Sequence, residues 1–220
     1  PGVVRWTALF SRRWLRRTVV AAGAWMLMDV ATYGVGQFAP SVLAELFTGW
    51  SGAGTIAAEF SSLKGAFALD SFLLLGFVMG MWAVPRLGPV KMQCIGFLGM
   101  AAGMCMLVVA VGPSGGAPPN FVAVITGFSI FNLLMNMGPN STTFSLPPLL
   151  FPPEIRGTAA GFSAACAKVG AVTGTLFLPT IKDAVGISGT LALLAALSGT
   201  GFLVTATLGR GLLPTTQPGG

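Results

Sequence analysis

The chain has 220 residues, of which 54% are hydrophobic and only 8% are charged, and its mean hydropathy is +0.81. Because a soluble globular domain has about 25% charged residues, this composition excludes a water-soluble domain and indicates an integral membrane protein. The net charge of +6 would otherwise suggest a nucleic-acid partner, but the basic residues gather beside apolar runs, so we expect topology signals and no nucleic acid.

Six apolar runs are each long enough to cross a bilayer as an α-helix, which needs about 20 mostly apolar residues. They do not alternate between apolar and polar residues, which argues against a transmembrane β-barrel. The runs cover residues 18–38, 65–84, 92–112, 121–146, 158–179 and 187–208. The sequence therefore predicts an all-α domain of six transmembrane helices at residues 18–208. A cytoplasmic basic segment, residues 1–17, precedes it, and a disordered cytoplasmic tail, residues 209–220, follows it.

Lysine and arginine predict the orientation, because cytoplasmic loops carry an excess of both. If the chain crosses six times, the side of the two termini holds Arg5, Arg12, Arg13, Arg16, Arg17, Arg86, Lys91, Arg156 and Arg210. The other side holds residues 39–64, 113–120 and a short turn near Lys182 and Asp183. Both termini of the chain are therefore predicted to be cytoplasmic. The arginines of "RRWLRR", residues 12–17, could instead mark a site for anionic lipids, although orientation with snorkelling is the simpler interpretation.

Two charged residues of opposite sign lie halfway along predicted spans. Asp29 lies in the first, within "AWMLMDVATYG", where Trp25 and Tyr33 share its helical face at four-residue spacing. Lys168 lies in the fifth. A lone charge at a helix centre costs about 2.5–3.5 kcal/mol, so we expect Asp29 and Lys168 to face each other or to share one polar cavity. The alternative is a purely structural buried ion pair.

Three asparagines, Asn132, Asn136 and Asn140, repeat at four-residue spacing in the fourth predicted span. They could line the same cavity, or they could serve as hydrogen-bonding links between helices. Glycines in the fifth span, among them Gly170 and Gly174, suit close helix packing, as do Gly157 and Gly161 just before them.

Catalytic and metal-binding chemistry is not indicated. The sequence has no histidine, and its three cysteines, Cys94, Cys105 and Cys166, lie in or beside apolar runs with spacing that suits no metal site or disulfide framework. No nucleophile–base set or cofactor loop is visible, so we expect neither an enzyme nor a cofactor. The chain begins with Pro1 and shows no recognisable signal peptide, and we expect it to be a piece of a longer protein.

Two stretches resemble a known family. "NMGPNSTTFSLPPLLFPPEIRGTAAGFSAACAKVGA", residues 136–171, resembles the signature region of the phosphate:proton symporters of the major facilitator superfamily. "WMLMDVATYG", residues 25–34, resembles the first helix of that family's C-terminal half. The resemblance implies that the chain is the second six-helix half of a twelve-helix plasma-membrane transporter, with the N-terminal half missing.

Carried over by position, the resemblance implies that phosphate is bound by Trp25, Asp29, Tyr33, Asn140 and Lys168, and Asn136 joins this set as a member of the asparagine stripe. Lys168 would attract the anion, and the neutral side chains would donate hydrogen bonds to it. A protonated Asp29 can donate a hydrogen bond to phosphate, whereas an ionised Asp29 repels it and pairs with Lys168. Proton occupancy would then control anion occupancy, which makes Asp29 the predicted proton-coupling residue.

The sequence departs from the family pattern on the cytoplasmic side. Leu149 stands where the family usually has an acid, Glu154 where it has an arginine, and Pro85 where the loop "PRLGPVKMQ" would begin with an acid. In the family these charges normally interact on the inner side and hold one conformational state. Their loss therefore affects the predicted gating and not the predicted binding cavity. Glu154 could pair with Arg156 or Arg86 as a partial substitute.

Two other functions fit the same residues. The chain could belong to a sugar or organic-anion porter of the same superfamily, because Lys168 favours an anion but does not set its size. It could also be a non-transporting membrane module, such as a nutrient sensor or a degenerate half, because the cytoplasmic loop has diverged.

Overall fold

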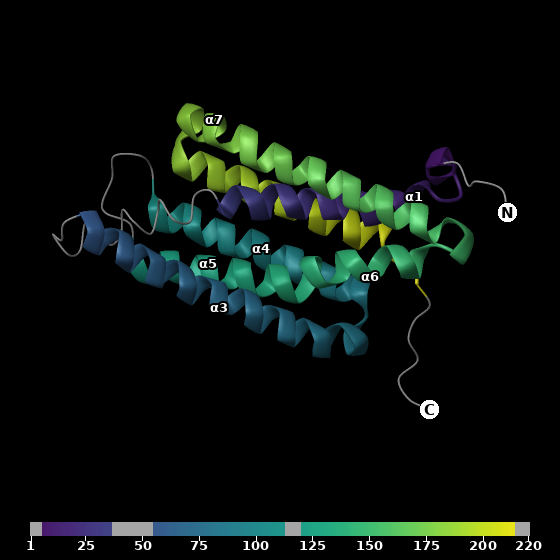
Figure 1. Ribbon diagram of the computed structural model, residues 1–220, viewed down its shortest axis with the longest axis horizontal. Helices are drawn as coiled ribbons and strands as arrows, with labels where there is room; N and C mark the ends of the chain where they lie inside the picture. Colours follow the sequence, from purple (N-terminus) through teal and green to yellow (C-terminus); the bar gives the residue numbers. More distant parts are fainter. Residues whose placement is uncertain (1–5, 37–54, 113–119, 214–220) are drawn as a thin grey trace.

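The computed structural model describes residues 6–36, 55–112 and 120–213, and every regular element in these ranges is helical (Figure 1). The chain enters through a short 3₁₀ helix, η1 (Trp6–Phe10), and then begins its first long helical stretch, Leu15–Gly36. That stretch starts as α1 (Leu15–Thr18), widens through one π-helical turn, η2 (Val19–Gly23), and continues as α-helix over residues 24–36. It is called the first span below.

The remaining helices pack together with the first span into an elongated bundle. In chain order they are α3 (Thr55–Leu87), α4 (Pro89–Val111), α5 (Phe121–Met135), the π-helical turn η3 (Asn136–Asn140), α6 (Ser141–Leu150) and α7 (Pro153–Leu208). Figure 1 shows α7 and the first span on one side of α4, with α3 on the opposite side.

Five of the described helical stretches are long and apolar enough to cross a membrane: Leu15–Gly36, Phe67–Leu87, Pro89–Val111, Val122–Leu150 and Pro153–Leu208. The first four agree with the first four predicted spans. The last, α7, contains the fifth and sixth predicted spans in one element. Gly186 interrupts it with a backbone conformation, φ 74° and ψ 175°, that L-residues other than glycine rarely adopt. The two arms of α7 run antiparallel on either side of Gly186 (Figure 1).

Two of the predicted loops differ in their bounds from those in the structure. Lys182 and Asp183 are helical residues of α7, and the turn expected there lies at Gly186. The loop predicted for residues 39–64 ends early, because α3 already begins at Thr55. Residues 37–54 and the predicted tail beyond residue 213 lie outside the described residues.

The core of the bundle is built around α4. Phe97, Met100 and Met104 are fully buried there, and they pack against Phe128 and Phe131 of α5 and against α7. The surfaces that face outward from α3 carry exposed large apolar residues, among them Phe67, Leu74, Phe77, Met81 and Trp82. Exposed apolar side chains along the outward face of a helix are the pattern expected in a bilayer.

Glycines bring the first span against α7. A Cβ atom added at Gly174 would lie 2.6 Å from the carbonyl oxygen of Val30, and one at Gly170 would collide with the carbonyl of Met26. The backbones of the first span and α7 are therefore in contact over one helical turn of each. The predicted close packing is confirmed for Gly170 and Gly174, whereas among the described residues no neighbouring helix comes within 4 Å of a Cβ atom added at Gly157 or Gly161.

Candidate functional site

The two intramembrane charges meet. The Lys168 ammonium lies 3.9 Å from Oδ2 of Asp29, so the predicted proximity is confirmed. Asp29 lies on the first span and is 4% exposed, whereas the side chain of Lys168, on α7, is 69% exposed. The separation is too long for a hydrogen bond, and Oδ2 of Asp29 has no hydrogen-bond partner among the described residues. The lysine therefore neutralises the carboxylate only loosely, and its ammonium keeps all three donors for another group.

The close approach at Gly170 and Gly174 explains why the charges lie level. Lys168 stands just before Gly170 on α7, and Asp29 stands between Met26 and Val30, the two residues whose carbonyls meet the glycines. Any side chain larger than hydrogen at either glycine would push the first span outward and lengthen the 3.9 Å contact. The distance between Asp29 and Lys168 therefore depends on the two glycines as well as on the charged residues themselves.

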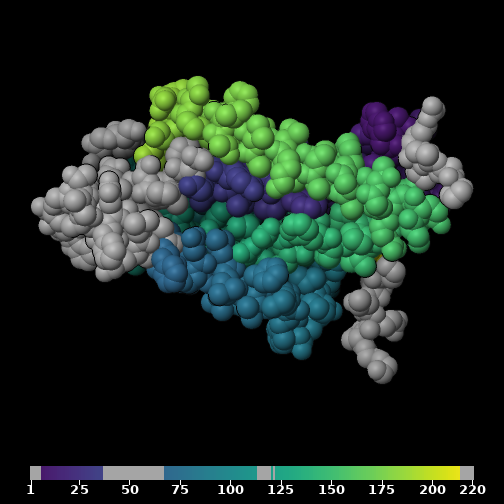
Figure 2. Space-filling view, viewed as in Figure 1, coloured from purple at the N-terminus to yellow at the C-terminus, as the bar shows by residue number. Residues whose placement is uncertain are grey.

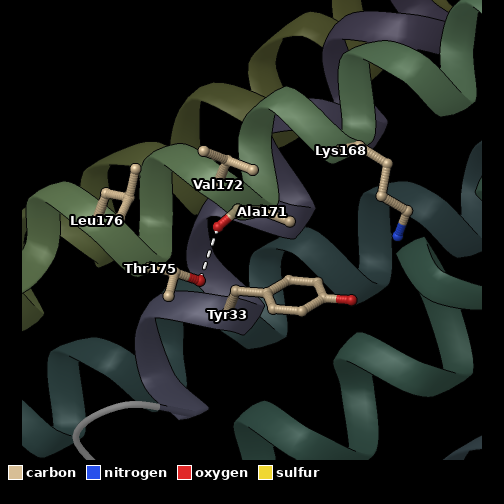
Figure 3. A pocket seen from close by; sticks show the side chains of 6 residues that line it. All are labelled: Tyr33, Lys168, Ala171, Val172, Thr175 and Leu176. Atoms are coloured by element: carbon tan, nitrogen blue, oxygen red, sulfur yellow. Dashed lines mark hydrogen bonds between the residues drawn. The ribbon is translucent and has the colours of Figure 1, made fainter.

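Tyr33 extends the site one helical turn beyond Asp29. Its ring centroid lies 5.7 Å from the Lys168 ammonium, within cation–π range, and the side chain is 44% exposed. Tyr33 and Lys168 open into a cavity of about 360 Å³, whose other lining residues are Ala171, Val172, Thr175 and Leu176. Figure 3 shows the phenol oxygen and the ammonium at the same end of this cavity. The cavity therefore presents one cation and one hydroxyl on a largely apolar wall.

The residues of α7 that line the cavity lie on one face of the helix, and their spacing in the sequence is consistent with this. Residues 168, 171, 172, 175 and 176 have the i, i+3, i+4, i+7, i+8 spacing of a single helix face. Only Lys168 was predicted from this set, because the others are ordinary packing residues. The Thr175 hydroxyl donates to the Ala171 carbonyl at 2.9 Å, as threonines in helices commonly do, and its oxygen can still accept (Figure 3).

Trp25 is buried and does not line the cavity at Tyr33 and Lys168. It is 7% exposed, belongs to the main hydrophobic core, and packs edge-on against Phe144 of α6 with ring centroids 4.7 Å apart. It therefore packs one turn below Asp29, between the first span and α6. Its participation in binding stays a prediction.

The asparagine stripe points mainly toward α3. Nδ2 of Asn132 donates to the Leu69 carbonyl at 3.2 Å, and Nδ2 of Asn136 donates to the Leu73 carbonyl at 2.7 Å. The interhelical interpretation is therefore the one that fits these two residues. The Asn140 amide donates to the Asn136 side-chain oxygen, and not to Asp29. A binding role for Asn136 and Asn140 stays a prediction.

A π-helical turn places Asn136 and Asn140 at its two ends. It contains Pro139, which has no N–H to give to the helix, and the hydroxyl of Ser141 donates to the carbonyl of Asn136 at 2.6 Å. Such single wide turns occur frequently at functional sites. The sequence prediction treated this region as ordinary helix.

The substitute ion pairs suggested for Glu154 do not form in the described part of the chain. Nε of Arg156 donates to the Phe151 carbonyl at 3.3 Å. Arg86 donates to the Trp82 carbonyl at 2.8 Å and stacks on the Trp82 ring at 4.1 Å. Both guanidinium groups are thus engaged locally, and Glu154 is exposed.

Comparisons with known proteins point to a family of transporters. Residues 6–212 match the family model described as "Sugar (and other) transporter". The chain is 30% identical over 220 residues to the probable inorganic phosphate transporter 1-6 of Arabidopsis thaliana, covering 91% of the chain and 40% of that protein. It is 31% identical over 210 residues to the inorganic phosphate transporter 1-6 of Oryza sativa subsp. japonica, covering 86% of the chain and 39% of that protein.

A solved structure has the same fold. The proton:xylose symporter XylE of the major facilitator superfamily, bound to 6-bromo-6-deoxy-D-glucose, superposes with a TM-score of 0.64 at 18% identity. The match covers 83% of this chain and 38% of XylE. The chain thus spans about 40% of the length of the curated relatives it matches. The resemblance to the phosphate symporters is confirmed, and the chain belongs to the sugar (and other) transporter family of membrane transport proteins.

Proposed function

We propose that the chain forms the C-terminal, six-helix half of a proton-coupled inorganic phosphate transporter that works by alternating access. The observation that carries this proposal is the approach of Asp29 and Lys168 to within 3.9 Å beside an open cavity. The names of the relatives, inorganic phosphate transporters of two plants, support phosphate as the substrate. The break at Gly186 supports six crossings, because each arm of α7 is long enough to span a bilayer by itself.

The missing partner of the site is an N-terminal six-helix half. It would cover the exposed side of Lys168 and Tyr33 and complete the cavity. The basic residues that gather at the end of the bundle with the two termini support a cytoplasmic placement of that end. A multi-pass protein of the plasma membrane, with the segment 1–17 and the tail beyond residue 208 on its inner side, follows from this placement.

Lys168 supplies the attraction for the anion. Its ammonium is exposed, only loosely paired with Asp29, and next to the hydroxyl of Tyr33. Phosphate at this end of the cavity would take a charge-assisted hydrogen bond from Lys168 and a neutral one from Tyr33. Asn140 would donate a further bond once its amide leaves Asn136, and Trp25 would close the inner end.

Asp29 couples the proton to the anion. Its Oδ2 lacks a donor, so a proton bound there gives the carboxyl a hydrogen to donate to a phosphate oxygen. Loss of that proton leaves a carboxylate that repels phosphate and competes for Lys168. The site would then bind proton and phosphate together and release them together, which is the differential binding that symport requires.

Uptake by the full protein that contains this chain tests the assignment. It would be reconstituted in vesicles, and entry of labelled phosphate would be followed with and without an inward proton gradient. The proposal expects accumulation of phosphate that requires the gradient and collapses with a protonophore. If phosphate enters equally well with and without the gradient, transport is not coupled to protons. If no phosphate enters but the protein binds another solute, phosphate is not the substrate.

A sugar or organic-anion porter is the second candidate. The mostly apolar cavity wall favours it, because Ala171, Val172 and Leu176 offer phosphate no hydrogen bonds. The family also includes sugar transporters, and XylE is a xylose symporter. Competition for phosphate uptake by a sugar, a carboxylic acid or unlabelled phosphate would separate the two candidates, because only unlabelled phosphate competes at a phosphate site.

A further inference from the structure

The segment that leads into the first span is folded against the bundle. Leu9 of η1 is 1% exposed and lies in a small core with residues of the first span, α6 and α7. The Phe10 ring meets Phe162 of α7 edge-on, with centroids 5.3 Å apart, and the Thr18 hydroxyl donates to the Leu9 carbonyl at 2.9 Å. Residues 6–17 are therefore a fixed part of the fold, which Figure 2 shows at the end of the molecule beyond the first span.

Two of the four arginines in this segment hold helix ends together. Nε of Arg16 donates at 2.7 Å to the Leu208 carbonyl at the end of α7, and Arg17 donates at 2.9 Å to the Leu150 carbonyl at the end of α6. Carbonyls at helix C-termini have no partner within the helix and carry partial negative charge, so guanidinium groups stabilise them. Arg16 and Arg17 therefore have a structural task.

The other two arginines have no such task in the described part of the chain. Arg12 and Arg13 are exposed, and neither takes part in a hydrogen bond or an ion pair there. The Arg13 guanidinium stacks over the Trp14 ring at 4.7 Å, on which Arg17 stacks as well at 4.9 Å. The result is an exposed pair of positive charges in a segment, residues 6–17, that contains no acidic residue.

Apolar groups lie beside this charge. Trp6 is 62% exposed and Phe10 is 48% exposed, and their rings meet edge-on at 6.0 Å. Leu15, the first residue of the first span, is 43% exposed. A segment in which arginines and exposed aromatics surround the start of a membrane-spanning helix lies at the depth of the lipid headgroups.

We propose that residues 6–15 form a binding surface for anionic phospholipid headgroups, with Arg12 and Arg13 contacting the phosphates. Trp6 and Phe10 would enter the boundary between headgroups and acyl chains, which a free phosphate ion could not use. The surface is distinct from the cavity at Lys168, which lies about halfway along the first arm of α7, and it does not depend on the substrate of that cavity. Each arginine near an anionic surface strengthens binding by about fivefold.

Lipid binding by the full protein tests the proposal. Fluorescently labelled phosphatidylglycerol and phosphatidylcholine would be titrated separately with the protein in detergent micelles and followed by anisotropy. We expect phosphatidylglycerol to bind more tightly than phosphatidylcholine, and this preference to shrink as salt is raised from 0.05 to 0.5 M because screening weakens exposed charges. Equal affinity for the two lipids, or a preference unaffected by salt, would overturn the proposal.

The double variant Arg12→Gln, Arg13→Gln identifies the residues. It should weaken phosphatidylglycerol binding by about 25-fold and leave phosphatidylcholine unchanged, since two charges of about fivefold each are lost. Arg86→Gln removes one exposed arginine at the end of α3 and serves as the matched control, with no more than a small effect. If the double variant binds phosphatidylglycerol as tightly as the unmodified protein, or if the Arg86→Gln control loses as much affinity, Arg12 and Arg13 do not form the lipid-binding surface.

Discussion

Gly174 of α7 lies so close to the Val30 carbonyl that a Cβ atom there would be 2.6 Å from the oxygen. This contact, with its neighbour at Gly170, sets the distance between the first span and α7, and hence the distance between Asp29 and Lys168.

Gly174→Leu should disrupt the site without touching a charged residue. The added side chain has no room against the first span, and overpacking of this kind costs about 1–3 kcal/mol. We expect a lower melting temperature in detergent and weaker phosphate binding. Gly161→Leu is the matched control, because no neighbouring helix in the described part of the chain lies within 4 Å of a Cβ atom added there. A Gly174→Leu protein as stable and as active as this control would show that the contact is not needed.

Lys168→Ala should abolish phosphate binding, because it removes the cation that faces the cavity. Lys168→Arg should retain part of the affinity, since the charge remains but its geometry changes. Equilibrium binding of labelled phosphate to the purified full protein measures both. Lys91→Ala, which removes a lysine near the start of α4, should bind phosphate normally. An unchanged affinity in Lys168→Ala would take this residue out of the site.

Tyr33→Phe should weaken phosphate binding by about fivefold, the effect of one hydrogen bond worth about 1 kcal/mol. The ring that lies 5.7 Å from the Lys168 ammonium is kept, so the lysine should stay in place. The dependence of binding on pH should therefore follow that of the unmodified protein. A Tyr33→Phe protein with full affinity would indicate that the hydroxyl does not reach the anion, and Tyr33→Leu would then report on the ring.

Asn136→Leu and Asn132→Leu should differ. Both remove an interhelical hydrogen bond to α3, and such bonds average about 0.6 kcal/mol in membrane proteins, so both should lower thermal stability slightly. Only Asn136 also bonds Asn140, so only Asn136→Leu should weaken phosphate binding as well. Equal phosphate affinities in the two variants would reduce Asn136 to a packing role.

The meeting of Asp29 and Lys168 could be predicted because burying a single charge in a membrane is costly, and two opposite charges at similar depth reduce that cost. The glycine contacts could be predicted only in part. Gly157, Gly161, Gly170 and Gly174 follow one pattern in the sequence, but only the last two face a neighbouring helix. Which side of a helix meets its neighbour depends on packing that a single sequence does not contain.

The asparagine stripe and the turn at Gly186 show the same limit. An asparagine amide can bond a neighbouring carbonyl or a ligand equally well, so spacing alone did not decide that Asn132 and Asn136 bond α3. The last two predicted spans both lie within α7, but the turn between them was predicted near Lys182 and Asp183, which are helical residues. The backbone turns instead at Gly186, where only glycine adopts φ 74° without strain.

The pH dependence of phosphate binding in Asp29→Asn tests the central claim most directly. Titrations at several pH values, on the unmodified full protein and on the variant, separate the effect of Asp29 from the titration of phosphate itself. We predict that binding to the unmodified protein weakens as pH rises and Asp29 loses its proton, whereas Asp29→Asn, which keeps an amide donor, binds phosphate without this loss. If the two proteins show the same pH dependence, Asp29 does not couple the proton to the anion.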